Sequence, residues 1–107
     1  MVLANGPGPA ENPPKGDGVK KVSVRGNYVS FWCVACKCPH AIRLSGTPSW
    51  SWNGSVDTPT FNPSLRMLGG KDVTLCHLNV TNGQIVYHQD SPHEYAGRTI
   101  PMVEWEE

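Results

Sequence analysis

The sequence lacks an excess of charge of either sign, and it lacks any long apolar run. Its 107 residues carry nine basic and nine acidic side chains. This balance gives no overall electrostatic footprint for nucleic acid or for an anionic membrane surface. No stretch approaches the roughly 20 apolar residues that a membrane helix needs. We therefore expect no membrane association, and we do not expect nucleic acid as a partner.

The first residues contain no basic segment followed by an apolar one, so we expect no secretory leader. We therefore expect the protein in the host cytoplasm, with a virion as the alternative location. Disulfides are rare in that reducing compartment. The four cysteines are thus expected as thiols, which leaves them available to bind a metal. Small domains often gain part of their stability from such an ion.

The first 18 residues differ in composition from the rest of the chain. Residues 1–18 are rich in proline and glycine and show no hydrophobic periodicity. This composition predicts an extended arm that does not join a packed core. Residues 19–107 are expected to form one zinc-stabilised β domain. An arm of this kind suits contacts with a neighbouring protein, so a protein partner or self-assembly is expected.

Helical periodicity is absent from the domain, whereas alternating β-branched and aromatic segments recur. Residues 22–32 predict a hairpin around Arg25-Gly26-Asn27, and Asn82-Gly83 predicts a second tight hairpin turn. Further strands are expected over 41–44, 49–52, 60–68, 73–80 and 85–87, with Pro63 marking an edge or a bulge. The predicted fold is mainly β: a small antiparallel sheet with a zinc-bound corner, similar to a zinc ribbon.

Two thiols at C-x-x-C spacing, Cys33 and Cys36, follow a predicted strand directly. A tight turn at this point can direct both sulfurs at one ion, as in structural zinc sites. A thioredoxin-like redox pair is an alternative, but that motif would open a helix within a βαβ unit. Ordinary buried cysteines are a second alternative. The spacing and the absence of helices favour zinc.

A structural zinc site takes four protein ligands. Cys76 is the expected third ligand because it lies in the predicted strand 73–80, far from the first pair. Either His40 or His93 would complete the set, so we expect one structural zinc ion bound by four of these five residues. His77 should point to the opposite face of its strand from Cys76. Cys38 is expected to be a spare thiol, and His88 a surface residue.

The chain resembles a family of small, uncharacterised Cys/His proteins encoded by phages and prophages. The shared motifs, in order, are Phe31-Trp32-Cys33-x-x-Cys36-x-x-x-His40, Trp52-Asn53-Gly54, Pro59-Thr60-Phe61-x-Pro63-Ser64, Cys76-His77, Asn82-Gly83-x-Ile85 and Asp90-Ser91-x-His93-x-x-Ala96-Gly97. The resemblance implies roles for Cys33, Cys36, His40, Cys76, His77 and His93. Members often carry the label ammonia monooxygenase. We reject that activity because it is copper chemistry in large membrane assemblies.

These features lead to a prediction of a non-enzymatic zinc-binding structural or interaction module. It would be phage-encoded, with a capsid decoration or cement protein as the specific version, in which the arm grips the capsid protein. One alternative is a zinc-dependent hydrolase, in which His77, Asp90 and His93 would serve as general base, orienting carboxylate or ligand. A second alternative is a regulatory binder of a host protein.

Overall fold

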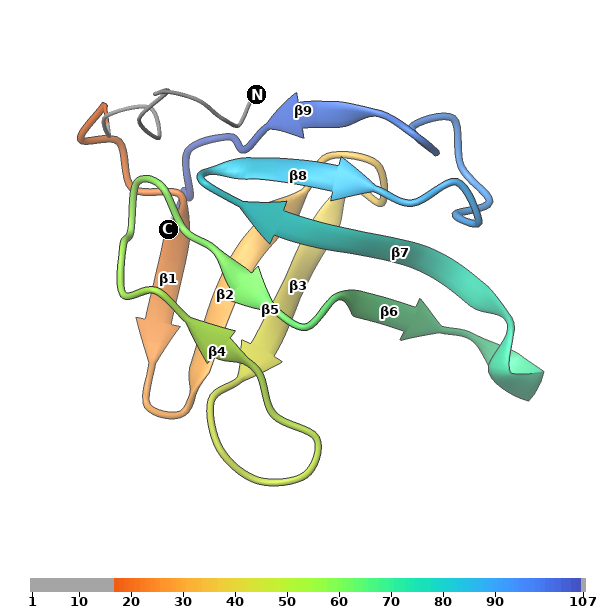
Figure 1. The fold of residues 1–107 in the computed structure, drawn as a ribbon, viewed down its shortest axis with the longest axis horizontal. Helices are drawn as coiled ribbons and strands as arrows, with labels where there is room; N and C mark the ends of the chain where they lie inside the picture. The colour runs from red at the N-terminus through yellow and green to blue at the C-terminus, as the bar shows by residue number, and fades with distance from the viewer. Residues whose placement is uncertain (1–16, 107) are drawn as a thin grey trace.

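The computed structural model describes residues 17–106, so nearly all of the predicted arm (1–18) lies outside the described residues. Within the described part, nine strands form three antiparallel sheets (Figure 1). The prediction of a mainly β, antiparallel fold is therefore confirmed, although the strands divide among three sheets. No helix among these residues is long and apolar enough to cross a membrane.

The first sheet contains β1 (Val22–Arg25), β2 (Tyr28–Cys33) and β3 (Cys38–Arg43) in that order. The turn between β1 and β2 lies where the sequence predicts it, and Gly26 supplies the positive φ of 56° that this turn needs. β3 begins three residues before the predicted strand. It does so because the turn after β2 is short, so that Cys33 and Cys38 pair directly across the two strands.

The second sheet is the smallest and consists of β4 (Ser51–Trp52) and β5 (Phe61–Asn62). The predicted strand 60–68 divides at Pro63, which has no N–H to donate to a ladder. Both indoles in this region are partly buried and donate from Nε1 to backbone carbonyls. Trp50 donates to Ser64 O at 3.1 Å, and Trp52 donates to Ser55 O at 2.9 Å.

The third sheet has the strand order β6-β7-β8-β9, with β6 at one edge. The short 3-10 turn η1 (Gly70–Asp72) joins its first two strands, and the Asn-Gly turn joins the next two. Positive φ angles of 50° at Asn82 and 79° at Gly83 confirm the predicted tight hairpin turn. The bounds of the strands are β6 Leu65–Leu68, β7 Thr74–Thr81, β8 Gln84–Tyr87 and β9 Thr99–Pro101.

One apolar core joins the first and third sheets. In Figure 1 the strands of the β6–β9 sheet run across those of the β1–β3 sheet. Side chains from both sheets belong to a single buried cluster. Cys76, Leu78 and Val80 of β7 are fully buried in this cluster. The residues between them, His77 and Asn79, lie on the other face because side chains alternate along a strand. β7 therefore carries two different surfaces.

Candidate functional site

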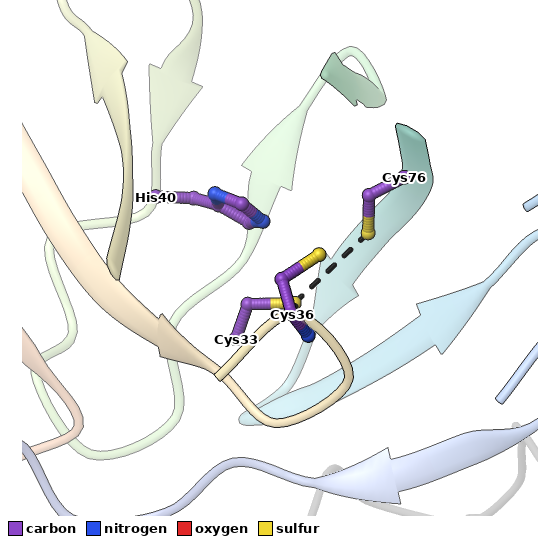
Figure 2. Close-up of side chains that lie close together, drawn as sticks. All are labelled: Cys33, Cys36, His40 and Cys76. Atoms are coloured by element: carbon purple, nitrogen blue, oxygen red, sulfur yellow. Dashed lines mark hydrogen bonds between the residues drawn. The ribbon is translucent and has the colours of Figure 1, made fainter. Parts of the chain in front are cut away.

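The inner surface of β7 contributes to a cluster of sulfur and nitrogen donors. Cys33, Cys36, His40 and Cys76 each place one donor atom within 4.8 Å of the others. Figure 2 shows the three sulfurs converging beside the His40 ring, with Cys33 and Cys76 approaching from different sheets. Their sulfur atoms are 4.0 Å apart. The cluster therefore links the β2–β3 turn to the centre of β7.

The β2–β3 turn has the backbone geometry that a C-x-x-C ligand pair requires. The Cys36 N–H donates to the Cys33 sulfur at 3.4 Å, and the Lys37 N–H donates to the Cys33 carbonyl at 2.8 Å. Lys37 takes a positive φ of 57° to close the turn. These contacts direct both thiols toward the same point in the core.

The donor set fits a metal ion. Within the described residues, His40 Nε2 is a buried nitrogen with no hydrogen-bond partner. Such a group is costly to bury unless something binds it. Three thiols and one imidazole within this distance of one another are compatible with the four-ligand shell of zinc, whose ligands lie about 2.0–2.3 Å from the ion. The cluster could hold a metal such as zinc, as the sequence predicts.

The structure also places His93, the fifth candidate ligand, and Cys38, the expected spare thiol. His93 Nε2 lies 3.3 Å from the Cys76 sulfur, so His93 borders the cluster without belonging to the four-residue set. Cys38 is partly buried opposite Cys33 in β3 and also lies outside that set.

Hydrogen bonds set the protonation of the thiols. The Cys33 sulfur lies near the Cys76 thiol, the Tyr87 hydroxyl at 3.3 Å and the Cys36 N–H. These donors, with Cys76 contributing most, hold the pKa of Cys33 well below its usual range. Donation to Cys33 and burial raise the pKa of Cys76, and burial raises that of Cys36 to about 11. Zinc binds cysteine as the thiolate, so metal binding at this cluster would release protons from these thiols.

The outer surface of β7 carries a second constellation, of a different kind. Ser64 Oγ lies 3.1 Å from His77 Nε2, and Asp90 Oδ1 lies 3.0 Å from His77 Nδ1. An ionised carboxylate can only accept, so Nδ1 of a neutral His77 donates to Asp90 and leaves Nε2 to accept the Ser64 hydroxyl proton. This is the hydrogen-bond order of a Ser-His-Asp catalytic triad.

Three separate segments bring these residues together. Ser64 immediately precedes β6, His77 lies in β7, and Asp90 follows β8 in a turn closed by the Ser91 N–H donating to the His88 carbonyl at 3.1 Å. The His77 side chain is 20% exposed and that of Asp90 is 56% exposed. The constellation is therefore open to solvent on the Asp90 side. The hydrogen bond from His77 lowers the pKa of Asp90 and keeps it ionised.

Neighbouring groups fix the position of His77. The buried Ser91 hydroxyl accepts the His77 backbone N–H at 3.0 Å and donates to the His77 carbonyl at 2.9 Å. The His88 ring stacks on the His77 ring with centroids 3.9 Å apart. His88 Nε2 in turn lies 2.7 Å from Asn79 Oδ1. The prediction of His88 as a simple surface residue therefore misses its contact with the central histidine.

Sequence reasoning separates Cys76 from His77, and the structure places them in different clusters. It does not single out Ser64, which appears in the sequence only within the motif Pro59-Thr60-Phe61-x-Pro63-Ser64. Asp90 is considered only as a partner for metal chemistry. The three residues follow one another at intervals of 13 positions. Ser64 does not lie in a local motif such as G-x-S-x-G, which would mark a nucleophilic serine in the sequence.

Comparison with known proteins finds a matching protein family. The family described as bacterial ubiquitination-like system serine protease (BubE) matches residues 9–88, about three quarters of the chain. No curated protein and no solved structure matches.

The family description names an enzyme, so the predicted non-enzymatic phage structural module, with its virion and capsid assignments, is wrong. The cysteine cluster has a local sequence motif, and that motif by itself predicts only a structural module. Ser64, His77 and Asp90 meet only in the folded sheet. The chain belongs to the family of bacterial ubiquitination-like system serine proteases (BubE).

Proposed function

We propose that this chain is a serine peptidase in which Ser64 is the nucleophile, His77 the general base and Asp90 the carboxylate that orients the base. The hydrogen-bonded series Ser64 Oγ, His77 Nε2, His77 Nδ1 and Asp90 carries the proposal. The family description agrees with it. The donor atoms of His77, His88 and Asp90 also lie close enough to hold an ion. We favour the triad because it accounts for Ser64 as well.

The proposed reaction is acyl transfer. His77 Nε2 takes the Ser64 proton as Oγ forms a bond to the substrate carbonyl carbon, and the same proton then passes to the leaving amine as the carbon–nitrogen bond breaks. Water, deprotonated by His77, releases the acyl group from Ser64 and restores the hydroxyl. Asp90 stays ionised throughout and stabilises the imidazolium that forms between these steps.

The family description is the basis for the proposed substrate class. We place the chain in a bacterial ubiquitination-like system, where it would cleave an acyl bond of a protein. The protein partner expected from the sequence then becomes its substrate. A reducing cytoplasm would keep its four cysteines as thiols, which is the state they have in the structure.

We propose one structural zinc ion bound by Cys33, Cys36, His40 and Cys76. Support comes from the unpartnered Nε2 of His40 and from the convergence of the three sulfurs. His93 would then donate a hydrogen bond to the Cys76 sulfur from outside the shell, as neighbours of metal-bound thiolates do. The ion would stabilise β7 one residue away from the catalytic base.

Hydrolysis of p-nitrophenyl acetate tests the nucleophile. Wild type should release a burst of about one p-nitrophenolate per chain as Ser64 is acetylated, and Ser64→Ala should abolish the burst. Ser51→Ala is the matched control because Ser51 is exposed and its hydroxyl makes only a 3.4 Å contact with the Asn62 carbonyl. An undiminished burst from the Ser64 variant would overturn the proposal.

A further inference from the structure

The edge strand β6 begins directly after the proposed nucleophile. It is the first strand of the order β6-β7-β8-β9, and no other strand in residues 17–106 pairs with its outer side. An open strand edge presents N–H and C=O groups that can pair with another extended chain. In Figure 1, β6 lies at the free border of its sheet.

The hydrogen bonds of His77 fix which backbone groups of β6 face this open edge. The His77 N–H donates to Ser91 Oγ and the His77 carbonyl accepts from the His88 N–H at 2.8 Å, so both groups point toward β8. Backbone groups alternate in direction along a strand, so those of Cys76 and Leu78 point toward β6.

Cys76 pairs with Met67, and Leu78 pairs with Leu65. The backbone N–H and carbonyl of Arg66, which lies between Leu65 and Met67, therefore point away from β7 to the open edge. No described residue bonds to either group. The Arg66 side chain is held separately, since its Nε donates to Thr74 Oγ1 at 2.8 Å.

The open edge ends at Ser64, whose carbonyl already accepts the Trp50 indole N–H. Beyond Arg66, the side chain of Leu68 is 50% exposed, and that of Leu75 on the adjoining strand is 51% exposed. Half-exposed leucines beside a free strand edge promote association with another chain. The free N–H and carbonyl of Arg66 and these two leucine side chains all lie on the β6 side of the proposed nucleophile, Ser64.

We propose that the substrate adds to the third sheet as an antiparallel strand along β6. This inference rests on the proposed function. The substrate residue with the attacked carbonyl would lie beside Ser64. In an antiparallel strand, the residue two positions before it would then pair with Arg66 and exchange both backbone hydrogen bonds. The intervening residue would point its backbone groups away from β6.

Tetrapeptide diphenyl phosphonates, which react covalently with a nucleophilic serine, test this pairing on the wild-type chain. One mixed-sequence set is unmodified, a second is N-methylated two positions before the phosphonate-bearing residue, and a third is N-methylated one position before it. We expect the second set to label Ser64 about tenfold more slowly, because it loses the hydrogen bond to the Arg66 carbonyl. The third set is the matched control and should label at a rate close to that of the unmodified set.

Variants of Arg66 test the other bond of the pair. Arg66→Pro removes the backbone N–H at a position where an edge strand tolerates proline, and it should slow labelling by the unmodified peptide set about tenfold. Arg66→Ala keeps both backbone groups and should label much faster than the proline variant. A small alkyl fluorophosphonate, which has no peptide backbone, should label wild type and both variants at similar rates.

The reagents separate two kinds of failure. If the alkyl fluorophosphonate does not label wild type, the proposed nucleophile and this inference both fall. If it labels Ser64 but the two N-methylated sets behave alike, or no peptide set reacts, the pairing with Arg66 is overturned and the proposed function stands. Because the N-methyl comparison uses the wild-type chain, misfolding of the proline variant would not obscure the result.

Discussion

Replacing Ser91 with alanine should weaken both the fold and the catalytic geometry. The substitution removes a buried hydroxyl that makes two hydrogen bonds to the His77 backbone, at 3.0 and 2.9 Å. The His77 carbonyl keeps a partner, because it also accepts the His88 N–H. The His77 N–H loses its partner within the described residues. The change therefore leaves one partly buried donor unsatisfied.

The unsatisfied His77 N–H determines how far Ser91→Ala should destabilise the fold. An unsatisfied buried donor costs about 1–3 kcal/mol, so we expect the free energy of unfolding to fall by about 2 kcal/mol. In a domain of this size that corresponds to a decrease in the unfolding temperature on the order of 10 °C. Labelling of Ser64 by a fluorophosphonate should also slow, by about tenfold or more, because a small displacement of His77 disturbs both of its catalytic hydrogen bonds.

Differential scanning calorimetry and labelling kinetics on Ser91→Ala measure the two effects, with Ser51→Ala as the exposed-serine control. Labelling is compared at a temperature where the variant is fully folded. If Ser91→Ala unfolds at the wild-type temperature and labels at the wild-type rate, the Ser91 hydroxyl does not hold the catalytic histidine in place.

Three further variants test the catalytic and metal sites. Asp90→Asn should slow labelling of Ser64 by at least about 100-fold. The hydrogen bond from His77 lowers the pKa of Asp90, so the ionised carboxylate stabilises the fold. This stabilisation should be complete above the ordinary carboxyl pKa and lost as the pH falls through the lowered pKa. The unfolding temperatures of wild type and Asp90→Asn should therefore differ near pH 6 and converge near pH 2. Cys76→Ser should lose bound zinc by elemental analysis and unfold at a much lower temperature, because the binding energy of a structural ion is folding energy; a full zinc complement would contradict the ligand assignment. His88→Ala removes the ring stacked on His77 and should slow fluorophosphonate labelling of Ser64 several-fold in assays quenched at set times. An unchanged labelling rate would show that the stacking has no catalytic effect.

Local sequence signals predict much of the fold. The Asn82-Gly83 turn, the β1–β2 hairpin and the alternation in β7 all follow from short-range rules, and the structure contains all three. The division of 60–68 is signalled only in part, by Pro63. β9 (Thr99–Pro101) is missed because three residues are too few for a periodic pattern, and the strand forms only by pairing with β8.

The two sites differ in how far sequence reveals them. Cys33 and Cys36 are close in the chain, so their spacing indicates a metal ligand pair before any fold is known. Ser64, His77 and Asp90 carry no such spacing signal. Their proximity depends on the register of β6 on β7 and on the turn after β8, and long-range pairings of that kind are not encoded in any short segment.

Alternation along β7 connects the two sites physically. Cys76 faces the core and the sulfur cluster, whereas His77 faces the outer surface and Ser64. An ion bound inside the fold would therefore restrain the strand that carries the base, without contact with substrate. In the proposed function, one face of the strand would contribute to stability and the other to catalysis.

The identity of the nucleophile is the central claim, and locating a covalent adduct tests it most directly. The full chain is treated with an alkyl fluorophosphonate, digested, and analysed by tandem mass spectrometry. We predict a single phosphonylated residue, Ser64, with no adduct after the same treatment of His77→Ala for the same time. A folded wild-type chain that carries no adduct, or carries it on a different serine, would contradict the account.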